Sequence, residues 1–486
     1  MTSGDQKMYD VGGNCFYSDL NVIKIDCSDE ELFCAMDLFN EKKVVLPVLR
    51  SFLHEHTHFI QYNTTPVGYY LKLLGSYQMA YLQKIASEML KSPEFTYPMM
   101  LHIQLRKNEK DRFKRPIHFY YYWYLAEVIR VYLTGERETF DYYLQKVMHG
   151  EFYGIFDFIL ELEPELVKIL NPAYPYTGRK LTAMKNEEQK NAFKTSVLLK
   201  NTVMKMGIKD LLESQALLSE YYYDDIADER LLKALEKKEF SSNQVDYLFP
   251  LILYRSLYSF DLTNKKDFLR FKLGFHAVCQ IALHAPVLPF HDKLGPLHTG
   301  DLEIDMRLPY LLNARRKISP PESLGDYDRY IDEMTRQNGY KSLESVSKSI
   351  FENREMIQNN IMRKVFRSKQ ERLFIGAQKI FLKDKSEFYR FLGGTASSPG
   401  MFYFKFTGKG PALDEDGVMN FYYDLLYQYY KELLMGYNAK NSPDAIMVSP
   451  VVELRRRDID LLKETVEKFN SIRPKPFPEM VWRKDE

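Results

Sequence analysis

The residues most able to carry chemistry stand together in one short stretch, where His54, Glu55 and His58 form a His-Glu-x-x-His motif. Each residue of a helix turns by roughly 100°, so positions four apart lie on nearly the same face. On a helix, the imidazoles of His54 and His58 would point the same way and could bind one metal ion. Glu55 would lie beside that ion, where a carboxylate can take a proton from an activated water. The motif therefore predicts a hydrolytic metal centre.

The residues around the motif favour the helix that this spacing requires. The segment 44–53 is mostly apolar, and Pro47 is compatible with the first turn of a helix, where a backbone N–H is not needed. Gln61 falls on the same face as the two histidines, where its amide could orient a ligand. His56 points away from the pair, so we expect it to have a structural or supporting role.

A third ligand is needed, because a catalytic zinc normally has three protein ligands and one open position. A nearby histidine, as in the extended pattern His-Glu-x-x-His-x-x-Gly-x-x-His, is excluded because Gln61 and Thr64 occupy the Gly and His positions. The third ligand is therefore expected to be a carboxylate from a later helix. The candidates are four glutamates on predicted helices: Glu88, Glu127, Glu213 and Glu220.

Glu213 is the preferred candidate among these glutamates. Ser214 and Ala216 are small enough to let its helix approach the motif helix. Ala216 and Leu217 lie three and four residues after Glu213, so its carboxylate shares a face with small and apolar groups. A carboxylate buried there needs a compensating charge, which a metal ion supplies. Glu127 is the alternative ligand on the same grounds.

The motif and the later segment Leu211-Leu212-Glu213-Ser214-Gln215-Ala216 together resemble the gluzincin branch of zinc metallopeptidases. The resemblance implies that His54, His58 and Glu213 bind Zn²⁺ and that Glu55 is the general base. It further implies a zinc-dependent metallopeptidase that hydrolyses peptide bonds of an intracellular protein or peptide. The separation of His58 from Glu213 is long for that family, and it implies a helical insertion between them.

Two rival interpretations of the motif can be compared with the rest of the sequence. A carboxylate-bridged di-iron site would need a second Glu-x-x-His, and no histidine other than His58 has Glu three places before it. We therefore discount it. The alternative that stays open is a non-enzymatic, aromatic-rich helical binding protein with a structural metal or none. The 36 Tyr and 32 Phe of the chain favour extensive aromatic packing, but a structural zinc often uses Cys and no Cys lies near the motif.

Composition and charge exclude several classes of partner. The chain has 486 residues and a formal net charge of +1 at pH 7, so neither nucleic acid nor a membrane is expected as a partner. No stretch reaches about 18 uninterrupted apolar residues, and the N-terminal residues lack an apolar signal core. The four cysteines form no CxxC pair. We expect a cytoplasmic protein whose partners are a protein or peptide substrate and a regulatory protein.

The patterns along the chain indicate a mainly α fold with a small β component. Asn21–Asp26 alternates like a strand ahead of the motif helix, and helical patterns dominate the rest. Prolines are dense between Pro286 and Pro321, which favours irregular chain there. We predict a zincin-like helical metallopeptidase core with a helical insertion at 1–290, a Pro-rich linker at 291–325, and a C-terminal α+β domain at 326–486.

Overall fold

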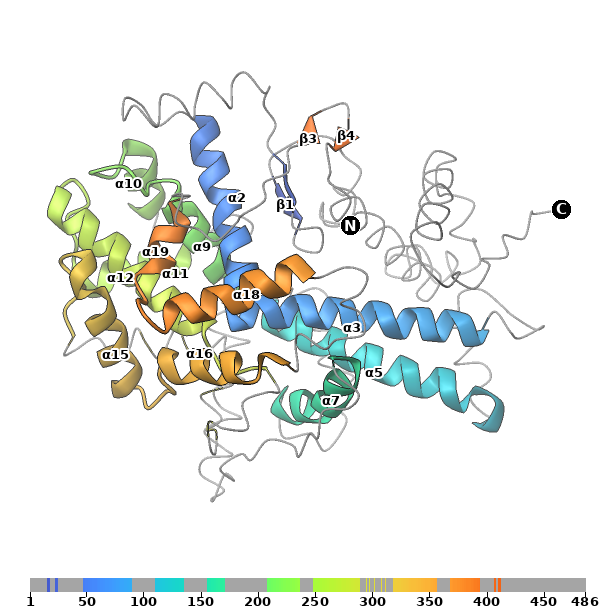
Figure 1. The fold of residues 1–486 in the computed structure, drawn as a ribbon. Coiled ribbons are helices and arrows are strands. Elements are labelled where there is room, and N and C mark those ends of the chain that lie inside the picture. The colour runs from blue at the N-terminus through green and yellow to red at the C-terminus, as the bar shows by residue number, and fades with distance from the viewer. Residues whose placement is uncertain are drawn as a thin grey trace. The chain divides into compact units, whose positions relative to one another are not determined.

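The computed structural model describes the chain in segments, which Figure 1 draws as ribbon. The longer segments cover residues 47–89, 110–134, 155–170, 208–236, 248–288, 318–355 and 368–393. Short pieces are described at 15–17, 22–24, 406–407 and 410–411, together with the single positions 294, 297, 301, 307 and 311.

Helices dominate the described part of the chain, so the predicted mainly α fold is confirmed. The zincin-like core and the C-terminal α+β region stay predictions. None of the described helices combines the length and apolarity that a membrane crossing requires. In chain order the helices are α2 (Pro47–Thr64), α3 (Pro66–Met89), α5 (Lys110–Thr134), α7 (Ile155–Leu170), α9 (Ile208–Ser219), α10 (Glu229–Glu236), α11 (Phe249–Tyr258), α12 (Lys265–Leu283), the 3-10 helix η4 (Leu324–Asp326), α15 (Tyr327–Gln337), α16 (Leu343–Glu352), α18 (Ser368–Phe381) and α19 (Glu387–Leu392).

The strands of the described segments are short and form two antiparallel pairs. β1 (Cys15–Tyr17) pairs with β2 (Val22–Lys24), with Phe16 opposite Ile23. β3 (Phe406–Thr407) pairs with β4 (Gly410–Pro411). β2 lies within the strand predicted at 21–26, and both β1 and β2 contact α2. The small β component therefore includes a hairpin beside the motif helix.

The chain divides into two compact units. The first comprises residues 1–74 and 125–412, and the second comprises 75–124 and 413–486. In the second unit, rings from the later part of α3 and the earlier part of α5 pack together, with the ring centres of Tyr81 and Phe119 5.7 Å apart. The first unit contains the whole motif and Glu213. The domain boundaries predicted at 290 and 325 stay a prediction.

Helix α2 is a central element of the first unit. β1, β2, α9, α18 and α19 all contact it, and Figure 1 shows α9, α18 and α19 around it. Because neighbours cover several of its sides, α2 buries polar as well as apolar residues: Leu53 and Ile60 are almost fully buried, and so are His56 and Gln61. Buried polar groups are normally held by hydrogen bonds, so this helix can present polar side chains in fixed orientations.

The junction of α2 and α3 requires a glycine. α3 begins at Pro66 directly after α2, and the Thr65 hydroxyl accepts a hydrogen bond from the backbone N–H of Gly68 (3.1 Å), as expected for a Thr cap before a Pro. A Cβ on Gly68 would lie 2.1 Å from the carbonyl oxygen of Gln61. The two helices therefore approach so closely here that a side chain has no room.

Helix α18 supports the end of α2 from a distant part of the chain. Gln378 donates from Nε2 to the carbonyl of Thr64 (2.6 Å) and accepts a hydrogen bond from the Ser347 hydroxyl of α16 (2.9 Å). The rings of Tyr69 and Phe374 stack with their centres 4.3 Å apart. The first unit therefore joins segments from both sides of the predicted linker.

Candidate metal centre

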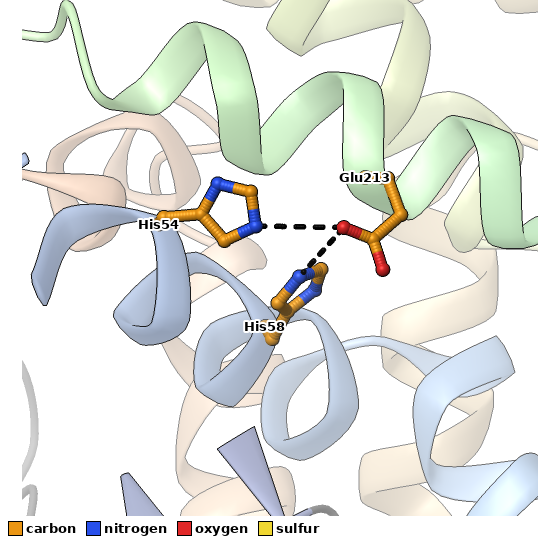
Figure 2. Close-up of side chains that lie close together, drawn as sticks. All are labelled: His54, His58 and Glu213. Atoms are coloured by element: carbon orange, nitrogen blue, oxygen red, sulfur yellow. Dashed lines mark ion pairs between the residues drawn. The ribbon is translucent and has the colours of Figure 1, made fainter. Parts of the chain in front are cut away.

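Two helices bring the predicted ligands together. α2 carries His54 and His58 one turn apart, and α9, which packs against α2, carries Glu213. Figure 2 shows both imidazoles directed at one carboxylate oxygen: Oε2 of Glu213 lies 3.4 Å from Nε2 of His54 and 3.4 Å from Nε2 of His58. One donor atom from each of the three residues lies within 4.8 Å of the others. The structure therefore assembles the three residues that the sequence singled out.

The spacing of these donor atoms suits tetrahedral coordination. Zinc binds imidazole nitrogen at about 2.0–2.1 Å and carboxylate oxygen at about 2.0–2.2 Å, so neighbouring donors of a tetrahedral site are roughly 3.3–3.5 Å apart. Both nitrogen–oxygen distances are 3.4 Å. This separation is longer than a normal charge-assisted hydrogen bond. Two of the three donor pairs therefore lie at a separation that a tetrahedral metal ion could bridge.

The imidazole of His58 is held in the orientation that metal binding needs. Its Nδ1 lies 2.8 Å from Oε1 of Gln61, and Nε2 of Gln61 donates to the carbonyl of Leu212 and to Oε1 of Gln215, both at 2.9 Å. Because a carboxamide oxygen can only accept, Nδ1 of His58 donates, and Nε2 is the ring nitrogen that faces Glu213. Gln61 therefore fixes His58 and at the same time ties α2 to α9. That this amide orients a ligand stays a prediction.

The imidazole of His54 is held by a carboxylate instead. Oε1 of Glu220 lies 3.0 Å from its Nδ1, an arrangement common among metal-binding histidines, whose outer nitrogen donates to a carboxylate or carbonyl. Burial lowers the pKa of His54, but Glu213 and Glu220 raise it more, to about 10. Burial raises the pKa of Glu213, but its contacts with His54 and His58 hold that pKa well below its usual range. The centre therefore strongly favours a positive charge between these carboxylates.

Glu55 follows His54 on α2 and is buried. Its negative charge adds to those that raise the pKa of His54, which places the carboxylate near the ligand pair. This position is the one that the motif predicts for a general base. The assignment of that role to Glu55 stays a prediction.

His56 and Glu127, also considered from the sequence, have other neighbours. His56 is buried between aromatic rings, with its ring centre 5.6 Å from that of Phe52 and 6.2 Å from that of Phe59, and burial lowers its pKa to about 4. Glu127 forms an ion pair with Arg130 on its own helix (2.9 Å). Glu88 lies on α3, and its side chain is outside the described residues. Of the candidate glutamates whose side chains the structure describes, Glu213 is therefore the one directed at both histidines.

Sequence reasoning missed Arg50 and the contact that Glu220 makes. Glu220 was considered as a ligand, whereas it contacts the outer nitrogen of His54. Arg50, one turn before His54 on α2, forms ion pairs with Asp224 (2.8 Å) and Asp228 (2.6 Å). Helical spacing could have indicated both. Arg50 lies four residues before His54 and Glu220 lies seven residues after Glu213, and residues at these separations share a helix face.

No family model, curated protein or solved structure matches the chain. The functional interpretation of the centre therefore depends on its geometry and chemistry.

Proposed function

We propose that this chain is a zinc-dependent metallopeptidase that hydrolyses peptide bonds of a cytoplasmic protein or peptide. The observation that carries the proposal is the donor spacing, because one Glu213 oxygen lies at the distance of a tetrahedral edge from Nε2 of both His54 and His58. Two imidazoles and one carboxylate are a known ligand set of zinc peptidases. A zincin-like core, in which α2 and α9 are the two metal-binding helices, is part of the same proposal.

The number and exposure of the donors support a catalytic rather than a structural metal. A structural zinc normally has four protein ligands, whereas the metal-binding group among the described residues has three. The side chains of His54 and Glu213 are 22% and 24% exposed, and that of His58 is 11% exposed. A centre with three ligands and partial exposure leaves a coordination position for water or substrate.

The residues of the site have distinct tasks in such a hydrolysis. Zinc, when bound by His54, His58 and Glu213, supplies a Lewis acid that makes water more acidic and polarises a carbonyl. Glu55 accepts the proton of the attacking water on its carboxylate and returns it to the leaving amine. Gln61 and Glu220 hold Nδ1 of His58 and Nδ1 of His54, so both Nε2 atoms face the Glu213 carboxylate, where an ion would bind.

A Glu55→Gln variant tests the proposal. Because an amide cannot accept the proton, this variant is expected to keep about one zinc per chain and to lose hydrolysis. Metal analysis measures the zinc, and mapping of new protein N-termini in cells expressing wild type or Glu55→Gln measures hydrolysis. Glu127→Gln is a matched control, because it removes a buried helical carboxylate outside the centre and should change neither quantity.

The same measurements separate the proposal from its alternative. Full hydrolysis by Glu55→Gln would exclude Glu55 as the base. A wild-type protein that binds zinc but generates no new N-termini would instead support a non-enzymatic binding protein with a structural metal. A protein that binds no zinc would remove the basis for a metallopeptidase.

A further inference from the structure

A buried lysine on α12 binds the turn that follows α9. The ammonium group of Lys272 donates to three backbone carbonyls, those of Tyr221 (3.0 Å), Tyr222 (3.1 Å) and Asp224 (2.6 Å). Lys272 is only 3% exposed. An ammonium group has three N–H donors, so these three carbonyls satisfy all of them. The turn after α9 therefore binds the ammonium group of Lys272 with three carbonyl oxygens.

The carbonyls that Lys272 binds belong to the turn directly after the C-terminus of α9, and that of Tyr221 also accepts from the N–H of Asp224 (3.1 Å). α9 ends at Ser219 and continues as a tight turn, in which the N–H of Tyr222 donates to the carbonyl of Ser219. Carbonyls at a helix C-terminus carry partial negative charge and favour a cation. Burial lowers the pKa of Lys272 to about 8, against the opposing effect of Asp224. The ammonium form, which supplies all three donors, therefore prevails at neutral pH.

The turn held by Lys272 carries the side chains that support the metal centre. Glu220 stands immediately before the three carbonyls and contacts Nδ1 of His54. Asp224 contributes one of the three carbonyls, and its carboxylate pairs with Arg50 of α2 (2.8 Å). Asp228, at the end of the same segment, pairs with the other side of that guanidinium (2.6 Å). The segment 220–228 is therefore fixed to α12 by its backbone and to α2 by its side chains.

We propose that Lys272 is a positioning residue for the metal centre: by binding the carbonyls of residues 221, 222 and 224, it holds Glu220 against His54. Lys272 of α12 fixes the backbone of the turn, and the turn places Glu220 at Nδ1 of His54, a proposed metal ligand. Loss of an outer partner typically weakens metal binding by roughly 10–100-fold. Removal of Lys272 is expected to do the same, although its nitrogen contacts backbone carbonyls and not the ion. This inference rests on the proposed zinc site.

The experiment compares Lys272→Met with Lys266→Met in the full chain. Methionine preserves the length of the side chain without the charge, and Lys266 is an exposed lysine of the same helix, paired with Glu322. Zinc affinity is measured by competition with a chelator, and the ligand geometry by the visible spectrum of the cobalt-substituted protein. Lys272→Met is expected to bind zinc about 10–100-fold more weakly and to alter the cobalt spectrum. Lys266→Met should match the wild type in both.

A double-mutant cycle with Glu220→Gln tests the route of the effect. If Lys272 acts through Glu220, the two losses in zinc affinity do not add, because each change releases the same imidazole. Full additivity, or unchanged affinity in folded Lys272→Met, would overturn the proposal. Should Lys272→Met not fold, Lys272→Gln retains two N–H donors, and the same weaker affinity and non-additivity are expected of it.

Hydrogen exchange separates this inference from the metallopeptidase proposal. In metal-free protein, Lys272→Met should speed amide exchange in residues 221–228, and Lys266→Met should leave it unchanged. Unchanged exchange in this segment would overturn the positioning role whether or not zinc binds. A wild-type protein without zinc affinity would contradict the proposed function, while this exchange measurement would still report whether Lys272 holds the turn.

Discussion

His54 of α2 and His276 of α12 have opposite environments. His54 on α2 faces Glu213 and Glu220, and its pKa rises to about 10. His276 on α12 is fully buried, with its ring centre 5.4 Å from that of Tyr389, and burial lowers its pKa to about 3. Neither ring nitrogen of His276 has a hydrogen-bond partner in the described part of the chain. The cationic form is thus favoured for His54 and the neutral ring for His276.

The difference shows why burial of a histidine alone does not indicate a metal site. Burial disfavours the charged form of any imidazole. Only a nearby carboxylate reverses that effect, and a site that attracts a proton in this way also attracts a metal cation. His284, another buried histidine of α12, lies near Phe381 and Phe388, and burial lowers its pKa to about 4. The carboxylates of Glu213 and Glu220 beside His54 therefore distinguish the candidate metal centre from these buried rings.

The largest expected effect comes from removing the shared carboxylate. Glu213→Ala should weaken zinc binding by more than about 100-fold, beyond the loss expected for an outer partner, because a direct ligand disappears. Chelator competition measures the affinity, and Glu127→Ala is the control with an unchanged value. Full zinc affinity in Glu213→Ala would contradict the assignment of Glu213 as a ligand. The contrast between His54 and the buried histidines of α12 would then not explain metal binding.

Two glycines test how rigid the surroundings of α2 and α12 are. In Gly68→Ala the new methyl group would meet the backbone of α2, 2.1 Å from the carbonyl oxygen of Gln61. In Gly274→Ala it would meet the hydroxyl end of the Tyr254 side chain at 2.0 Å, which can move more easily than backbone. We expect about 3 kcal/mol of destabilisation for Gly68→Ala and a smaller loss for Gly274→Ala. Denaturant unfolding measures both, and equal losses would contradict the predicted rigidity of α2.

The amide that links α2 to α9 is expected to have an intermediate effect. Gln61→Leu removes the acceptor for Nδ1 of His58 and should weaken zinc binding by about 10–100-fold. Gln61→Glu keeps an oxygen acceptor at this position and should retain more of the affinity. The two variants therefore distinguish the loss of orientation from a change in volume. Equal affinities in both would argue against the orienting contact.

The pH dependence of stability should reveal the neutral histidine of α12. The pKa of His276 is about 3 in the folded protein, below the value of about 6.5 in an unfolded chain. Between these values the unfolded state binds more protons, so the free energy of unfolding falls as the pH decreases below about 6.5. The contribution of this group approaches about 1.4 kcal/mol per pH unit.

His276→Phe tests this contribution, because it removes the titrating ring and keeps an aromatic one. Denaturant unfolding at pH 7 and pH 5 is expected to show a smaller acid-induced loss for His276→Phe than for wild type. An identical loss in both proteins would mean that His276 is protonated in the folded state, and would remove the contrast with His54.

Local patterns in the sequence predicted much of this structure. The spacing of His54 and His58 placed both rings on one face of α2, and the small residues after Glu213 favoured the helix that packs against it. The strand predicted at 21–26 contains β2 (Val22–Lys24).

Contacts between distant segments could not be predicted in the same way. Periodicity shows which residues share a helix face, but not which faces meet. The pairing of Glu220 with His54 and the binding of the 221–224 carbonyls by Lys272 both depend on how α9 and α12 pack in the folded unit. Such contacts follow from tertiary packing, which a single sequence leaves open.

The placement of the ligands has a consequence for synthesis. His54 and His58 leave the ribosome together, whereas Glu213 emerges only after a long intervening stretch. A nascent chain that ends before residue 208 therefore carries two of the three donors and none of α9. The proposed ion would be bound by all three residues only after α9 has been synthesised. The proposed activity would therefore begin after much of the chain has been made.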